Sequence, residues 1–140
     1  MRVAVKPAPE AGNPELELAR NLTLFVYVMH ALASACFVTF FVAIFVNYSR
    51  RGRVAGTVYE SHFDWQIGTF WYSLLYFTLG VILVIWAIVR FSGHQASGGG
   101  WLLALGLLLL FFNLCWHLYR VIRGLMHWSD RKPMRTVFRA

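Results

Sequence analysis

The sequence predicts an all-α integral membrane protein with three transmembrane helices and a short amphipathic cytoplasmic helix that leads into the second. Of the 140 residues, 59% are hydrophobic and 14% are charged, whereas soluble proteins carry about 25% charged residues. The apolar residues gather in three runs, at about 22–46, 67–89 and 101–119. Each run is long enough to cross a bilayer, which takes about 20 residues in a helix. The alternating ten-residue segments of a membrane β-barrel are not visible.

The chain is expected to have a tail at each end of a three-helix transmembrane domain, which covers residues 14–128. Residues 1–13 are rich in proline and are expected to be disordered. The stretch Asn13-Pro14-Glu15 is typical of a helix start. Asn caps the helix, Pro suits its first position, and an acid favours the positive end of the helix dipole. Residues 129–140 form a basic C-terminal tail.

The first apolar run is too long for a cleavable signal peptide, whose apolar region has 7–15 residues. Its middle contains small side chains, which let another helix approach closely. A basic stretch, Arg50-Arg51-Gly52-Arg53, follows the run and is expected to end the first helix at the cytoplasmic face.

A stripe of polar and small residues crosses from the polar stretch "ESHFDWQ" into the second apolar run. Its members recur every three or four residues, which is the helical period: His62, Gln66, Thr69, Ser73, Tyr76 and Gly80. The second helix should therefore begin near Val58, before the bilayer. Glu60 and Asp64 are four residues apart and share another face of it, at the cytoplasmic end. Because lipid penalises polar groups, the stripe is expected to face protein.

The third helix carries a matching stripe in its cytoplasmic half: Asn113, His117, Arg120 and Gly124. The second and third helices should be antiparallel, so side chains at similar depth can pair. The predicted pairs are Ser73 or Tyr76 with Asn113, Gln66 with His117, and Glu60 or Asp64 with Arg120 or Arg123. Such interhelical hydrogen bonds contribute about 0.6 kcal/mol each. The polar stretch is thus interpreted as a contact that holds two helices together.

The net charge of +7 is interpreted as a membrane-orientation signal, and no nucleic-acid partner is expected. Three spans would place four basic residues on the side of the N-terminus and nine on the side of the C-terminus. Since cytoplasmic segments are enriched in Lys and Arg, the N-terminus is expected outside and the C-terminus in the cytoplasm. The tail should contact anionic lipid at the cytoplasmic face through Arg131, Lys132, Arg135 and Arg139.

Candidate redox and metal residues form no recognisable site. Cys36 and Cys115 lie at similar depth in the predicted spans and are interpreted as buried thiols. His30 and His117 would lie about 12 Å and about 24 Å from the outer ends of their helices, which argues against a haem between them. The three histidines near the cytoplasmic face, His62, His117 and His127, match no compact zinc motif even with Glu60 and Asp64. No catalytic residue, metal or cofactor is therefore expected.

Two stretches carry a resemblance, "YESHFDWQIGTFWYSLL" at residues 59–75 and "HWSDRKPMRTVFR" at residues 127–139. With the three apolar runs, they resemble a widespread family of small bacterial membrane proteins of unknown function. That family is grouped with the small multi-helix subunit of the chloroplast inner-envelope protein translocon. Glu60, His62, Trp65 and Gln66 match its motif, although this chain has Asp-Trp-Gln where the family favours Asn-Phe-Gln. The resemblance covers residues 22–137 and implies a multi-pass protein of the bacterial inner membrane.

The expected function is that of a non-catalytic accessory or scaffold subunit. It would bind a larger membrane assembly, or a second copy of itself, through the polar face of the second helix and the small-residue face of the first. The alternative is a homo-oligomer that conducts ions or small solutes, because polar groups inside a membrane can mark an ion path. A weaker alternative is a redox subunit that binds haem or quinone.

Overall fold

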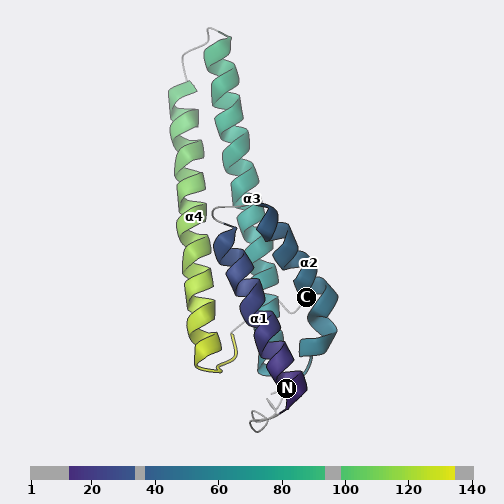
Figure 1. Cartoon of the computed structure of the whole chain (residues 1–140). Helices are drawn as coiled ribbons and strands as arrows, with labels where there is room; N and C mark the ends of the chain where they lie inside the picture. The colour runs from purple at the N-terminus through teal and green to yellow at the C-terminus, as the bar shows by residue number, and fades with distance from the viewer. Residues whose placement is uncertain (1–12, 34–36, 94–98, 135–140) are drawn as a thin grey trace, which may run out of the picture. The chain divides into compact units, whose positions relative to one another are not determined.

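The computed structural model describes residues 13–33, 37–93 and 99–134, in which all regular secondary structure is α-helix. The helices are α1 (Pro14–Leu32), α2 (Phe37–Val54), α3 (Val58–Ser92) and α4 (Gly99–Ser129) (Figure 1). The predicted all-α class is confirmed. The predicted disordered tail, apart from Asn13, lies outside the described residues, as do Cys36, Arg135 and Arg139.

Two helices, α3 and α4, are long and apolar enough to cross a membrane. They contain 35 and 31 residues, which correspond to about 52 Å and about 46 Å of helix. Both lengths exceed the hydrocarbon core of a bilayer, which is about 30 Å thick. The second and third apolar runs therefore lie within single helices. As predicted, α3 begins at Val58, before its apolar run.

The first apolar run does not form one spanning helix, so the third predicted span is not confirmed. Residues 22–46 are divided between α1, which ends at Leu32, and α2, which begins at Phe37. The two helices run antiparallel beside each other (Figure 1). Hydropathy alone does not separate the two arrangements, because 25 apolar residues suit either one long helix or two short ones. The polar residues of α1 favour two short helices, because in that arrangement they are buried inside the protein.

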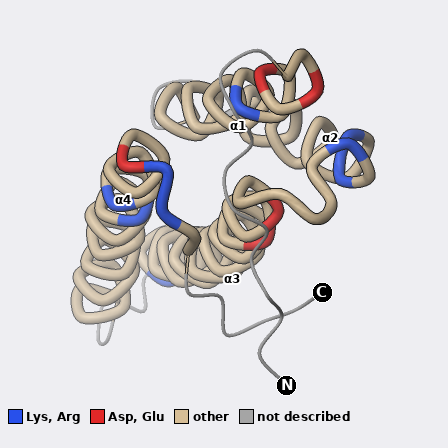
Figure 2. The backbone as a smooth tube through the Cα atoms, turned by 90° about the horizontal axis from the view of Figure 1, so that it is seen from below, with Lys and Arg blue, Asp and Glu red and all other residues tan. Residues whose placement is uncertain are grey.

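The fold separates into two compact units. The four-helix unit contains α1, α2, the part of α3 up to Phe70 and the part of α4 from Arg120. The helix-pair unit is Trp71–Tyr119 and contains the remaining parts of α3 and α4. Charged residues divide unequally between the units, since Arg90 is the only Asp, Glu, Lys or Arg among residues 71–119. Among the described residues, Figure 2 marks further charged positions on α1, α2, the start of α3, the end of α4 and the segment just after α4.

In the four-helix unit, the start of α1, the end of α2, the start of α3 and the end of α4 meet in one apolar core. The core consists of Ala19, Val54, Tyr59 and Phe63, with Leu16, Leu22 and Trp128 packed against it. The indole Nε1 of Trp128 donates to the Arg20 carbonyl over 3.2 Å, and the Arg20 guanidinium lies 5.1 Å from the centre of the Trp128 ring. These contacts hold four helix ends together at the same end of the unit.

In the helix-pair unit, α3 and α4 run antiparallel (Figure 1), and two glycines on them face the neighbouring helix closely. A Cβ atom on Gly80 would lie 2.7 Å from the Leu110 side chain, and one on Gly106 would lie 2.9 Å from Val84 Cγ2 and 3.1 Å from the Gly80 carbonyl oxygen. Such separations require a neighbour to move, so glycine is needed for the two backbones to come this close. The sequence stripe included Gly80 but not Gly106.

Replacing Gly106 by leucine should destabilise the helix pair, because the new side chain would occupy space that Val84 and the α3 backbone fill. We expect a loss of about 1–3 kcal/mol, the usual cost of overpacking. Thermal unfolding in a mild detergent, followed by tryptophan fluorescence, measures the effect. Gly100→Ala is the matched control, since a Cβ atom there meets nothing within 4 Å. Equal melting temperatures for the two variants would contradict the close approach.

Candidate functional site

The four-helix unit buries an unusual number of polar side chains, and these form the candidate site. Two sequence stripes supply most of them, since Thr23, Tyr27 and His30 follow helical spacing on α1 and His62, Gln66 and Thr69 do so on α3. Each of these six side chains is at most 2% exposed. The α1 stripe was not recognised in the sequence as a buried face. Its spacing of four and three residues was the signal that could have identified it.

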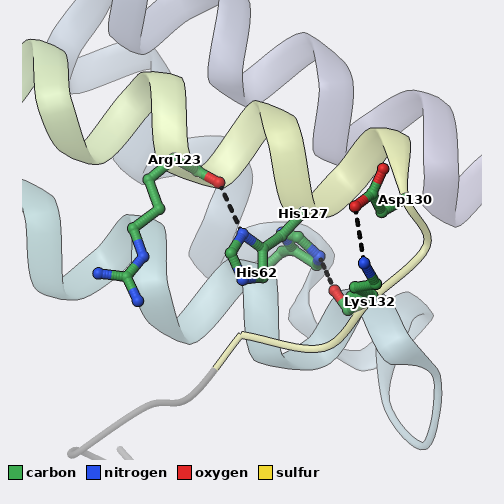
Figure 3. Close-up of polar contacts among 5 residues, drawn as sticks. All are labelled: His62, Arg123, His127, Asp130 and Lys132. Carbon is green, nitrogen blue, oxygen red and sulfur yellow. Dashed lines mark hydrogen bonds and ion pairs between the residues drawn. The ribbon is translucent and has the colours of Figure 1, made fainter.

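His62 joins α1 to the segment that follows α4. Its Nε2 lies 3.0 Å from the Lys132 carbonyl oxygen (Figure 3), and its Nδ1 lies 2.8 Å from the Tyr27 hydroxyl. A carbonyl only accepts hydrogen bonds, so Nε2 carries the proton. In the neutral ring Nδ1 is then the acceptor, and the Tyr27 hydroxyl donates to it. One neutral tautomer therefore satisfies both contacts.

Burial lowers the pKa of His62 to about 4, and the positive charge of His127 adds to this effect, while the hydrogen bond to the Lys132 carbonyl opposes it. His62 precedes the apolar run that starts at Ile67, so it lies outside the predicted span.

The segment after α4 is fixed by backbone contacts. The backbone N–H of Met134 donates to Ser61 Oγ over 3.0 Å, and that of Lys132 donates to the His127 carbonyl over 2.9 Å. The Lys132 ammonium forms an exposed ion pair with Asp130 (Figure 3), and its hydrogen bond lowers the pKa of that carboxyl group. The predicted lipid-facing residues Arg131 and Lys132 are both exposed here.

Gln66 connects α3 to α1. Its Nε2 donates to the Thr23 carbonyl over 3.2 Å, and Gln66 is fully buried. The predicted partner of Gln66 was His117, and the structure places the Thr23 carbonyl there instead. Within the described residues, Gln66 Oε1 has no hydrogen-bond partner.

Arg120 holds α4 to α3 at the edge of the four-helix unit. Its Nε donates to Thr69 Oγ1 over 2.8 Å, and a terminal nitrogen donates to the Trp65 carbonyl over 3.0 Å. Thr69 Oγ1 in turn donates to the same carbonyl over 2.8 Å. The guanidinium carbon lies 3.5 Å from the centre of the Trp65 ring, and Trp65 Nε1 donates to the Arg120 carbonyl over 3.2 Å. The structure thus brings together Thr69 and Arg120, two of the predicted polar contact residues.

The two predicted cytoplasmic acids stabilise the turn between α2 and α3. Glu60 accepts a hydrogen bond from the backbone N–H of Gly56 over 2.8 Å. Gly56 has a φ of +74°, a conformation that favours glycine. Asp64 forms a 2.8 Å ion pair with Arg51 of α2, in which the Asp64 side chain is 6% exposed. Sequence analysis did not predict either of these partners.

In the helix-pair unit, Ser73 Oγ lies 3.0 Å from His117 Nδ1. The predicted partner of Ser73 was Asn113, so the pairing of the two helices differs by one turn of α4. Tyr76 packs its ring edge-on against Phe112 and Trp116. Asn113 is 8% exposed, and its Oδ1 has no hydrogen-bond partner in the described part of the chain.

The polar side chains of the four-helix unit leave little room for a ligand. Six residues border the space between them: Tyr27, His30, Gln66, Thr69, Arg120 and Val121. This space is too narrow to admit a water molecule. In residues 13–33, 37–93 and 99–134, no group of three or more His, Cys, Asp or Glu residues is arranged to hold a metal ion. The arrangement joins helices by hydrogen bonds between buried groups.

Comparisons of the chain with protein-family models, with curated proteins and with solved structures find no match. The site is therefore interpreted from its own geometry. That geometry defines a helical protein with two helices able to cross a membrane and a buried polar network at one end of them.

Acidification should destabilise the four-helix unit through His62. An unfolded histidine has a pKa of about 6.5, and the folded pKa is about 4, so between these values the unfolded chain binds more protons. The stabilisation is complete above pH 6.5 and is lost as the pH falls from 6.5 towards 4. The loss should reach about 3 kcal/mol. Thermal unfolding in detergent between pH 7.5 and pH 4.5 measures it.

Carboxyl groups also titrate in this range, so the informative quantity is the difference between the wild type and His62→Gln. That variant keeps a donor for the Lys132 carbonyl and removes the titrating group. His127→Gln is the control, because His127 is only half-buried and its substitution should leave most of the pH dependence in place. A His62→Gln variant that loses stability as steeply as the wild type would contradict the assignment.

Proposed function

We propose that the protein is a non-catalytic membrane scaffold, in which α3 and α4 anchor the chain and the four-helix unit serves as a folded platform for a larger membrane assembly. The observation that carries this proposal is the use of the buried polar side chains. Tyr27, His62, Gln66, Thr69 and Arg120 all bond within the chain. The space bordered by four of them, Tyr27, Gln66, Thr69 and Arg120, is too narrow for a water molecule. Their chemistry is that of a structural network.

Because these polar side chains are buried within the chain, a partner would have to bind elsewhere than on the polar face of α3. The polar face of α3 was expected to contact a partner, yet its members His62, Gln66, Thr69 and Ser73 are buried inside the chain. The helix-pair unit instead exposes a largely apolar surface. The large exposed side chains of the helix-pair unit include Trp71, Trp86, Trp101, Phe111 and Phe112. A membrane partner would therefore bind through apolar and aromatic contacts, which are typical of interface cores.

For the topology, we propose two crossings and both termini in the cytoplasm. The start of α1, the start of α3 and the end of α4 share one core, which supports placing them on the same side. Arg90 is the only one of the 13 Lys and Arg residues in residues 71–119. The other 12 would then lie on the cytoplasmic side, as the positive-inside rule favours. This differs from the expectation of an external N-terminus, which assumed three crossings. The resemblance to small bacterial proteins supports the inner membrane as the location.

A conducting homo-oligomer is the second candidate. Ser73, Asn113 and His117 are buried polar residues inside the predicted spans, and polar groups at such depth can line an ion path. In this case several copies would have to enclose the path.

Native mass spectrometry of the protein, extracted from its own membrane in mild detergent, tests the scaffold. We expect a complex with a different membrane protein at a fixed ratio, because the exposed apolar surface requires a partner or lipid. Gly106→Leu, which distorts the exposed surface of the helix pair, should lower the amount of that complex, and Gly100→Ala should not. A homo-oligomer alone, with ion flux in vesicles that Ser73→Ala or Asn113→Leu changes, would replace the scaffold by the conducting oligomer.

The topology predicts which tags an impermeant reagent reaches in intact cells. Tags before Met1 and after Ala140 should both be unreactive until the membrane is opened. A tag inserted between residues 93 and 99 should react from outside, and it serves as the positive control. An N-terminal tag that reacts from outside while the C-terminal tag does not would restore the topology with three crossings.

A further inference from the structure

The α1–α2 hairpin has apolar arms that are too short to cross a bilayer. The apolar part of α1 extends from Leu22 to Leu32 and that of α2 from Phe37 to Val46. These parts are about 16 Å and about 15 Å long. A hydrocarbon core is about 30 Å thick, so each arm matches one leaflet.

The contacts of the hairpin with α3 also indicate how deep the hairpin would lie in a bilayer. The Phe40 ring of α2 lies 4.5 Å from the Phe70 ring and 5.5 Å from the His30 ring, measured between ring centres. Phe70 is only three residues beyond Ile67, where the apolar run of α3 starts, and Phe40 is close to the tip of the hairpin. The Phe40 end of α2 therefore contacts the start of that run.

The outward face of the hairpin is apolar and open on both arms. Its exposed side chains are Phe25, Val28, Leu32, Val38, Phe41, Val42 and Phe45. Val38 and Phe45 are 68% and 71% exposed. Large apolar side chains exposed on two neighbouring helices require an apolar cover.

The residues at the base of the hairpin indicate what covers it. Arg20, Arg50 and Arg53 are exposed where the apolar arms end, and Tyr48 is 50% exposed at the same level of α2. Cationic side chains together with an aromatic ring at the end of an apolar segment are typical of the boundary between lipid headgroups and acyl chains. Anionic headgroups complement these cations.

We propose that the α1–α2 hairpin inserts into the cytoplasmic leaflet alone, where its exposed face contacts acyl chains and its arginines contact anionic headgroups. The inference rests on the proposed topology, in which α3 and α4 make the two crossings. Insertion into one leaflet adds protein volume to that leaflet and none to the other. The chain would thus bind a lipid monolayer with a surface separate from its spans.

Spin labels on a full-length chain in vesicles of phosphatidylethanolamine and phosphatidylglycerol test this proposal. The background carries Cys36→Ser and Cys115→Ser. The double variant Phe25→Cys/Phe45→Cys reports the fold of the hairpin. Packed antiparallel helices should place the two labels less than about 20 Å apart, whereas a continuous helix would separate them by about 30 Å. The longer distance would overturn the proposal.

A single label at Val38→Cys reports depth and surroundings. We expect strong collisions with dissolved oxygen, weak collisions with a water-soluble nickel chelate, and a depth of about 10–15 Å below the headgroups. Strong collisions with nickel would place the hairpin outside the bilayer. Protection from both reagents would mean that a protein, such as a second copy, covers the face. Either result would overturn the proposal.

Leu79→Cys is the control that separates this inference from the proposed topology. Leu79 is 45% exposed and lies near the middle of the apolar run of α3. Its label should be the deepest of the set. A label at Leu79 that collides with nickel would disprove the two crossings themselves, whatever the result at Val38.

Discussion

Polar side chains that are buried inside a protein must find their hydrogen-bond partners there, because burial removes them from water. This constraint organises the four-helix unit. Gln66 bonds to a carbonyl of α1, His62 bonds to a hydroxyl of α1 and to the backbone after α4, and Arg120 bonds to Thr69 and to a carbonyl of α3. The polar stretch before the second apolar run thus gathers three other segments around α3. Of its polar atoms, Gln66 Oε1 has no hydrogen-bond partner among the described residues.

The sequence predicted the features that periodicity and composition determine. The polar stripe of α3, the start of that helix at Val58 and the two long apolar helices all depend on local spacing and on runs of apolar residues. The division of residues 22–46 into two helices does not. It depends on how Thr23, Tyr27 and His30 are buried against other helices, and hydropathy treats one long helix and two short ones alike. Recognising that the polar stripes of α1 and α3 are both buried would have distinguished two short helices from one long helix.

The partners within the network were harder to predict than its members. Depth along two antiparallel helices is known only to about one turn, and a shift of one turn moves the partner of Ser73 from Asn113 to His117. Three other contacts involve backbone carbonyls, those of Thr23, Trp65 and Lys132. Every residue has a backbone carbonyl, so the sequence does not indicate which carbonyl accepts a hydrogen bond. Asp64 pairs with Arg51, which a topology with three crossings also places nearby.

The segment after α4 is attached to α3 mainly through its backbone, so its side chains can be substituted. His62 binds the carbonyl of Lys132, and Ser61 accepts from the backbone of Met134. The segment is held through atoms that almost every residue type supplies. Substitutions at position 132 can therefore accumulate without loosening the attachment, whereas a change at His62 or Ser61 removes one half of it. The specificity of this junction therefore resides in the side chains of α3, which hold the backbone of residues 132 and 134.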